Sequence, residues 1–219
     1  MDADLQHPPE TLAKMIEEAK KGNDIIIASR YTNKGRIEKF GFFRRLTSRG
    51  ATFLTHALLR ETRNVKDPMS GFFIFRRNIL DGKTIESSGY KVLLELLVKS
   101  GDGAKVTEIP YVFGQRTLGK SKLTVGENVK FISLLLMLSN YRPVKFLAVG
   151  LTGVAVNEGL LFLLHTFTPL SLLLAGAISI ESSILSNFFL NNVWTFRDRK
   201  LGGWTRGVIK YNLVALPGA

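Results

Sequence analysis

The sequence contains no cysteine, and its acidic residues are scarce relative to its basic ones. Without cysteine there can be neither a disulfide framework nor a thiolate metal site. The chain has 30 Lys and Arg against 18 Asp and Glu, a formal net charge of +12 over 219 residues, so an anionic partner is expected. Nucleic acid, anionic lipid headgroups and phosphorylated substrates all satisfy this charge, and the length allows one to two domains.

Charge is nearly absent from two long stretches of the C-terminal third. Residues 146–165 contain Glu158 as their only formal charge, and a helix of this length is roughly 30 Å long, the thickness of a bilayer core. Residues 170–189 repeat the pattern with Glu181 inside, after a break at Thr168-Pro169. These stretches predict a transmembrane hairpin, and an apolar run from about 208 predicts the start of a third span that is cut short.

Basic residues flank the outer ends of the predicted hairpin and are missing from its connection. The positive-inside rule therefore places both ends, and the rest of the chain with them, in the cytoplasm. Glu158 and Glu181 either serve a transport pathway or hydrogen-bond across the helices, with Asn157 and Asn187 as candidate partners; we favour packing. Small residues that would allow close packing stand at Gly150, Gly153 and Gly159.

The first residues of the chain offer oxygen ligands at alternate positions. In an extended segment Asp2, Asp4 and Gln6 point to the same side, whereas His7 points to the other. Ligation by oxygen alone favours Mg²⁺ or Mn²⁺ over Zn²⁺, and such ions usually complete their shell with substrate phosphates. The same spacing before Pro8-Pro9 also fits a solvated turn.

An α/β pattern follows this motif. Residues 8–20 predict a helix that ends at Gly22, residues 24–29 a buried parallel strand, and residues 72–75 a second buried strand. A helix at 90–99 and an edge strand at 106–113 complete the pattern. A metal motif at the very start of such a domain predicts that the chain is the C-terminal portion of something longer.

Three further segments can meet an anion or a membrane. The basic run at 30–49, with interleaved phenylalanines, is either a solvated face or a surface that meets phosphates beside an apolar phase. Residues 42–60 and 123–143 predict amphipathic helices, which lie on a membrane surface or face an ordinary core. The loop at 114–122 either closes over an anion or is a mobile surface loop.

Four stretches occur in an order that resembles one family. They are Asp2 to Glu10 (DADLQHPPE), Ala28 to Tyr31 (ASRY), Asp67 to Phe72 (DPMSGF) and Arg116 to Lys122 (RTLGKSK). This order resembles the polyprenyl-phosphate hexosyltransferases of glycosyltransferase family 2, and within them the dolichol-phosphate mannose synthases. Residues 146–157 and 181–196 resemble the start of a GtrA-type membrane domain, although only two spans are present where that family usually shows four.

The resemblance implies a Rossmann-like domain of glycosyltransferase A type. Residues 1–122 would be the C-terminal portion of this catalytic domain, 123–143 an interface helix and 144–219 a GtrA-like transmembrane domain. The implied enzyme is an inverting one that transfers a hexose, mannose from GDP-mannose, to dolichyl or polyprenyl phosphate at the cytoplasmic membrane face. The half that would hold the nucleoside is missing, so the chain alone is expected to bind the donor poorly.

The resemblance also implies roles for individual residues. Asp2, Asp4 and Gln6 would hold Mg²⁺ or Mn²⁺, with Asp4 and Arg116 as catalytic residues. The donor would be bound by Asp2, Asp4, Arg116 and Lys122, and the acceptor phosphate by Arg30, Arg44, Ser48 and Arg116. An acceptor phosphate monoester is already ionised at neutral pH, so its attack on the sugar needs positioning and not a general base.

Three other functions remain open on the sequence. A nucleic-acid-binding protein would explain the charge, but its basic residues would hardly share a chain with a spanning hairpin. A polyprenyl-phosphate glucosyltransferase that uses UDP-glucose would share the motifs. A non-catalytic membrane scaffold or lipid translocator would need only the spans.

Overall fold

The computed structural model describes residues 7–33, 35–37, 42–87, 91–101, 103–114, 125–198 and 204–215. It divides into two compact units, Met1–Leu138 and Ser139–Ala219. The first unit contains α1 (Glu10–Lys20), β1 (Ile25–Ser29), β2 (Arg36–Ile37), α2 (Phe42–Leu58), η1 (Arg60–Thr62), β3 (Phe73–Phe75), η2 (Arg77–Leu80), α3 (Val92–Ser100), β4 (Val106–Pro110), β5 (Val112–Phe113) and α4 (Val125–Leu138). The second contains α5 (Arg142–Phe167), α6 (Leu172–Leu190), the π-helix η4 (Asn191–Thr195) and α7 (Trp204–Ala215).

The main sheet of the first unit has the strand order β3-β1-β4, with β1 in the centre. β1 is parallel to β4, with Ile25 opposite Val106, and antiparallel to β3, with Ile25 opposite Phe75. The parallel strand expected at 24–29 and the edge strand expected at 106–113 are therefore confirmed. The strand expected at 72–75 is present as β3, but it is not fully buried, because it pairs along one side only and Phe75 is 40% exposed.

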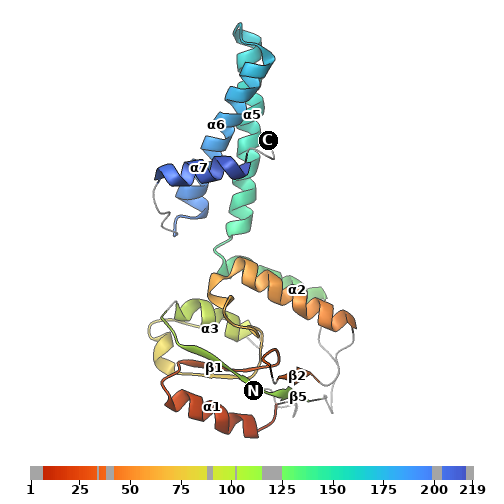
Figure 1. Ribbon diagram of the computed structural model, residues 1–219, viewed down its shortest axis with the longest axis vertical. Coiled ribbons are helices and arrows are strands. Elements are labelled where there is room, and N and C mark those ends of the chain that lie inside the picture. The colour runs from red at the N-terminus through yellow and green to blue at the C-terminus, as the bar shows by residue number, and fades with distance from the viewer. Residues whose placement is uncertain are drawn as a thin grey trace. The chain divides into compact units, whose positions relative to one another are not determined.

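Helices cover both faces of this sheet, and β1 supplies the core of each face. Ile25 and Ile27 pack against α3, where Leu93 contributes, while Ile26 and Ala28 pack on the α1 side. All five residues of β1 are buried because successive side chains point to opposite, covered faces. The result is a three-layer arrangement, with α1 on one side of the strands and α3 on the other (Figure 1).

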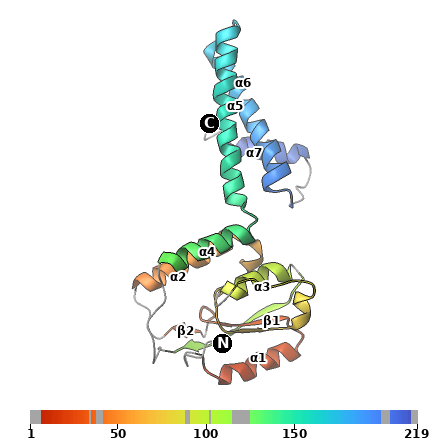
Figure 2. The same cartoon turned by 180° about the vertical axis from the view of Figure 1, so that it is seen from behind.

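The helices α2 and α4 form a further layer on the outer side of α3. Leu94 of α3 packs with Leu59 and with Phe131 of α4, and α2 and α4 run beside one another (Figure 2). The helices expected at 42–60 and 123–143 are thus confirmed. α4 ends earlier than expected, because Asn140 and Tyr141 follow it at positive φ. The two helices also keep large apolar side chains exposed: Leu46, Phe53, Leu54, Val129, Ile132 and Met137.

Two helices of the second unit, α5 and α6 with its η4 extension, are long and apolar enough to cross a membrane. Within their apolar windows only 11% and 22% of the residues are buried inside the protein, as expected of helices that face lipid. The first helix begins at Arg142 and not at 146, and the second continues to Thr195 instead of ending at 189. The run expected from 208 belongs to α7, which starts at Trp204.

The two long helices approach each other closely at Gly153. A Cβ atom there would lie 2.5 Å from Asn187 Oδ1, and the Ser183 hydroxyl donates to the Gly153 carbonyl at 2.7 Å. Positions Gly150 and Gly159 face open space, so only one of the three glycines forms the expected packing face. Close approach of backbones through glycine is typical of helix pairs in membranes.

The two acidic residues of the hairpin differ in their contacts. Asn212 of α7 donates to Glu181 at 2.6 Å, so Glu181 bonds another helix as expected, but its partner is neither Asn157 nor Asn187. Glu158 is exposed and accepts a bond from Asn157, its neighbour on the same helix, at 3.4 Å. Within the described residues Glu158 has no bond to another helix, so its packing role stays a prediction, and Asn187 packs on Gly153 instead of pairing with either carboxylate.

Glu95 of α3 fixes the loop that precedes its helix. Its side chain is fully buried and accepts bonds from the backbone of Glu86 at 3.1 Å, from the backbone of Ser87 at 2.7 Å and from Lys99. Burial alone would raise the pKa of Glu95, but the hydrogen bonds from Lys99, Ser87 and Glu86 outweigh it and lower the pKa to about 2.

We expect Glu95→Gln to destabilise the first unit by about 2 kcal/mol, because it removes a charged acceptor of several hydrogen bonds. In the unmodified protein, Glu95 binds protons less readily when folded than when unfolded. Its contribution to stability is therefore complete above the ordinary glutamate pKa and is lost as the pH falls from there towards 2. Pulse proteolysis in urea of the detergent-solubilised protein measures both effects.

The matched control is Glu86→Gln, since the Glu86 side chain is exposed and its backbone alone contacts Glu95. Equal losses of stability in the two variants, or an unchanged acid dependence in Glu95→Gln, would contradict the assignment.

Candidate functional site

The parallel strands β1 and β4 end at the same edge of the sheet. Ser29 lies opposite Pro110 at the last paired position, and the chain continues from there into Arg30 and Tyr111. Loops at the carboxyl ends of parallel strands are where α/β proteins bind ligands. We call residues 29–31 and 110–113 the carboxyl edge.

A buried ion pair lies at the carboxyl edge. The backbone N–H and the Nε of Arg30 donate to Asp67 Oδ2 at 3.0 and 2.8 Å, and Nη2 donates to Oδ1 at 2.7 Å. The two side chains are 14% and 1% exposed. Arg30 was expected to bind a phosphate, but Asp67 was named only as the first residue of the Asp67 to Phe72 motif, without a role.

The charge of Arg30 depends on this pair. Burial alone would lower the pKa of the Arg30 guanidinium, but the hydrogen bond and charge of Asp67 outweigh burial and raise that pKa. Because an isolated buried charge is costly, each partner needs the other in order to stay in this position. The planar guanidinium is consequently held in one orientation by bonds on one of its edges.

The loop that presents Asp67 is held from two strands. Glu108 of β4 accepts the backbone N–H groups of Lys66 and Asp67 at 2.9 and 3.0 Å. The buried Ser70 hydroxyl donates to the Ala28 carbonyl of β1 at 2.7 Å and accepts the Phe72 N–H at 3.2 Å. These hydrogen bonds hold the Asp67 to Phe72 segment in place and so fix the position of the Asp67 carboxylate.

A bond between hydroxyl groups joins the carboxyl edge to α2. The Tyr31 hydroxyl lies 2.8 Å from the Ser48 Oγ, so the residue next to Arg30 contacts another predicted acceptor residue. The structure therefore brings the segments of Arg30 and Ser48 together. Arg44 precedes Ser48 by one helical turn on α2, but its side chain lies outside the described residues.

An aromatic cluster borders the ion pair. The His7 ring is buried, with its centroid 5.0 Å from that of Phe72 and 5.8 Å from those of Tyr111 and Phe113. Arg30 Cζ lies 5.6 Å from the centre of the same Phe113 ring. The residue that directly follows the Asp2–Gln6 motif and the guanidinium of Arg30 therefore contact one side chain.

The other predicted site residues cannot be placed. Asp2, Asp4 and Gln6 of the metal motif, and Arg116 and Lys122 of the loop, lie outside the described residues. Within the part that is described, no group of three or more His, Asp or Glu side chains could hold a metal. The donor set itself, carboxylate and amide oxygens without cysteine, fits a hard ion.

Two regions of the chain match known families. Residues 1–82 match glycosyl transferase family 2, and residues 145–219 match the GtrA/DPMS transmembrane domain. The first region contains the predicted metal motif, the ion pair and the predicted acceptor residues of α2, and the second contains both long helices.

Several relatives resemble this chain over much of its length. It is 43% identical over 100% of its residues to a dolichol-phosphate mannosyltransferase of Pyrococcus furiosus, and covers 63% of that protein. It is 33% identical over 71% of its length to a dolichol-phosphate mannosyltransferase of Mycosarcoma maydis, covering 54% of it. It is also 31% identical over 59% of its length to a polyprenol monophosphomannose synthase of Mycolicibacterium smegmatis, covering 49%. The chain thus spans about half to two thirds of these relatives.

The turn after β1 comes unusually close to the carboxyl edge at Gly35. A Cβ atom there would lie 2.6 Å from the Ser29 carbonyl oxygen and 2.9 Å from the Arg30 carbonyl carbon. We expect Gly35→Ala to displace the backbone of these residues and to destabilise the first unit by about 2 kcal/mol, the range for overpacking.

Gly50→Ala is the matched control, because a methyl group at this position of α2 meets open space and Ala favours a helix. Pulse proteolysis in urea should show a loss for position 35 and none for position 50. Equal stability of the Gly35→Ala variant and the unmodified protein would show that the turn can move away without cost.

Proposed function

We propose that this chain, whose residues 1–82 belong to glycosyl transferase family 2 and whose residues 145–219 belong to the GtrA/DPMS transmembrane domain family, is part of an enzyme that transfers mannose to a polyprenyl or dolichyl phosphate. One observation supports this most: His7, at the end of the metal motif, and Arg30, a predicted acceptor residue, both contact Phe113. Donor and acceptor would thus meet at the carboxyl edge. The similarity to a dolichol-phosphate mannosyltransferase and to a polyprenol monophosphomannose synthase supports mannose as the sugar.

In this proposal the acceptor phosphate lies beside Arg30, Ser48 and Arg44. The bonds to Asp67 engage the Nε and one Nη of Arg30, and a guanidinium has five N–H donors, so donors remain for a phosphate oxygen. The acceptor is a phosphate monoester, which is ionised at neutral pH and needs no general base. One of its oxygens attacks C1 of the sugar as the bond from C1 to the nucleoside diphosphate breaks. A single displacement of this kind inverts the configuration at C1.

On the donor side, Asp2, Asp4 and Gln6 would hold Mg²⁺ or Mn²⁺, and Arg116 and Lys122 would contact the donor from their loop. A bound divalent ion would stabilise the charge that develops on the departing diphosphate. Asp4 and Arg116 are the residues of this chain that we assign to catalysis. The nucleoside is not assigned to any described residue, so GDP as its identity stays a prediction from the family resemblance.

The acceptor lipid requires the site to lie at a membrane surface. The two families and the two apolar helices indicate a membrane protein. The exposed apolar side chains of α2 and α4 support our proposal that these helices lie in the headgroup region, with Phe53 the most exposed of them at 71%. We place the catalytic unit on the cytoplasmic side because basic residues cluster at the outer ends of the hairpin.

We expect Asp4→Asn to lower mannosyl transfer by at least 100-fold, because it removes a charged metal ligand. The measurement is transfer of radiolabelled mannose from GDP-mannose to polyprenyl phosphate by membranes that contain the protein. Asp81→Asn, at an exposed turn of the same unit, should retain full activity.

Parallel reactions with UDP-glucose test the alternative donor. Faster transfer of glucose than of mannose would contradict the assignment of the sugar. Retention of full mannosyl transfer by Asp4→Asn would contradict the role of the motif.

A further inference from the structure

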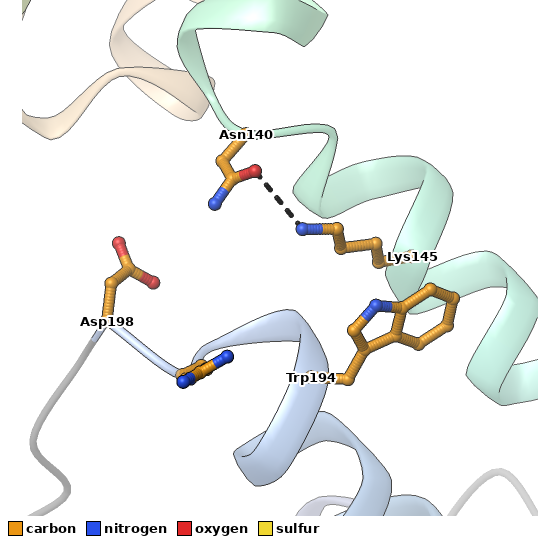
Figure 3. A pocket seen from close by; sticks show the side chains of 5 residues that line it. Asn140, Lys145, Trp194 and Asp198 are labelled. Carbon is orange, nitrogen blue, oxygen red and sulfur yellow. Dashed lines mark hydrogen bonds between the residues drawn. The ribbon is translucent and has the colours of Figure 1, made fainter.

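A cavity lies at the charged end of the hairpin, within the second unit. Its volume is about 480 Å³, and its lining residues are Asn140, Lys145, Trp194, Arg197 and Asp198. Figure 3 shows Asn140 and Lys145, at the start of α5, turned towards the segment that carries Trp194 and Asp198. We call these five residues the interface pocket.

The interface pocket contains more positive than negative charge. Asp198 forms an ion pair with Arg142, so these two charges offset each other. Lys145 donates to the neutral amide oxygen of Asn140 at 3.1 Å. Among the residues that the structure describes, neither Lys145 nor Arg197 pairs with a carboxylate. The pocket therefore has two cations available for an anion.

The backbone at the entrance of the pocket is strained. Asn140 and Tyr141 are consecutive residues with φ of 55° and 53°, a region that non-glycine residues seldom occupy. This turn ends α4 and starts α5, and it lets the Asn140 amide bond Lys145. Such strain persists only where the surrounding structure requires it, and it is concentrated at ligand sites.

The side chains around the pocket indicate that its ligand lies at the boundary between the hydrocarbon and the headgroups of a membrane. Phe146 and Leu147, which follow Lys145 on α5, are 50% and 65% exposed, and Trp194 is 50% exposed. The Phe146 and Phe196 rings lie 6.5 Å apart and join the two helix ends at this level. Exposed apolar side chains with a Trp beside Lys and Arg mark the boundary between hydrocarbon and headgroups.

We propose that the interface pocket binds the phosphate headgroup of an anionic phospholipid. The Lys145 ammonium and the Arg197 guanidinium hold the phosphate oxygens, and the acyl chains run along the exposed apolar side chains that begin at Phe146. A soluble anion would gain the charge interactions but not the apolar ones. This site does not depend on sugar transfer, and its ligand is a component of the membrane and not the acceptor of the reaction.

Trp194 offers a direct measurement, because the sequence contains only one other tryptophan, Trp204. In a Trp204→Phe background, the protein is reconstituted in phosphatidylcholine vesicles that contain phosphatidylglycerol brominated at carbons 6 and 7 of one acyl chain. The quenching of Trp194 fluorescence by this lipid is compared with the quenching by brominated phosphatidylcholine. We expect association with phosphatidylglycerol to be about tenfold stronger, since each cation near an anionic surface contributes on the order of 1 kcal/mol.

Lys145→Ala and Arg197→Ala should each reduce this preference about threefold, and the double variant should abolish it. Lys210→Ala, an exposed cation on α7 of the same unit, is the matched control and should leave the preference unchanged. Quenching by brominated phosphatidylcholine should be the same in all variants, which shows that the hairpin is still inserted. Inorganic phosphate at about 20 mM should not restore Trp194 emission, because a soluble anion gains the charge interactions but not the apolar ones.

Three results would overturn the proposal. They are equal quenching by the two phospholipids in the unmodified protein, an effect of Lys210→Ala as large as that of Lys145→Ala, and displacement of the lipid by inorganic phosphate. Unlabelled undecaprenyl phosphate should displace the brominated lipid no better than unlabelled phosphatidylglycerol. Displacement at a tenfold lower mole fraction would assign the pocket to the acceptor and would also overturn the proposal.

Discussion

The buried ion pair between Arg30 and Asp67 is the interaction on which the candidate site depends. It joins the end of β1 to the loop before β3, and Glu108 of β4 holds that loop in turn. A buried charge that loses its partner is strongly unfavourable, so the pair fixes the loop as much as the loop fixes the pair. The geometry leaves one edge of the guanidinium for another anion, in a place where parallel strands end.

The two units differ in what they bury and what they expose, and the proposed function uses both properties. The first unit buries β1 completely between helices and so provides a rigid edge for polar residues. The second unit exposes two helices that are long and apolar enough to cross a membrane, and basic residues stand at the outer ends of this hairpin. In the proposed function, the polar edge would hold the reacting groups and the apolar helices would keep the site beside the lipid phosphate.

Periodicity and composition predicted most of the fold. The helices, the central strand and both spans follow from local patterns, because each buries or exposes a regular face. The partner of Arg30 did not follow, since Asp67 is 37 residues away and its own surroundings indicate only a turn. The contact of Glu181 was not predicted for the same reason, because its partner Asn212 lies 31 residues further along the chain, on α7. Local sequence identifies an element and its faces, but a long-range polar contact depends on how loops between elements close.

The central claim is that Asp67 orients Arg30 for the acceptor phosphate. Steady-state kinetics of mannosyl transfer by Asp67→Asn, with polyprenyl phosphate and GDP-mannose varied separately, tests this claim most directly. We expect the KM for polyprenyl phosphate to rise by at least tenfold, the loss of a charge-assisted hydrogen bond, while the KM for GDP-mannose stays unchanged. A fall in kcat that follows the amount of folded protein, with both KM values unchanged, would show that the pair stabilises the fold without orienting Arg30.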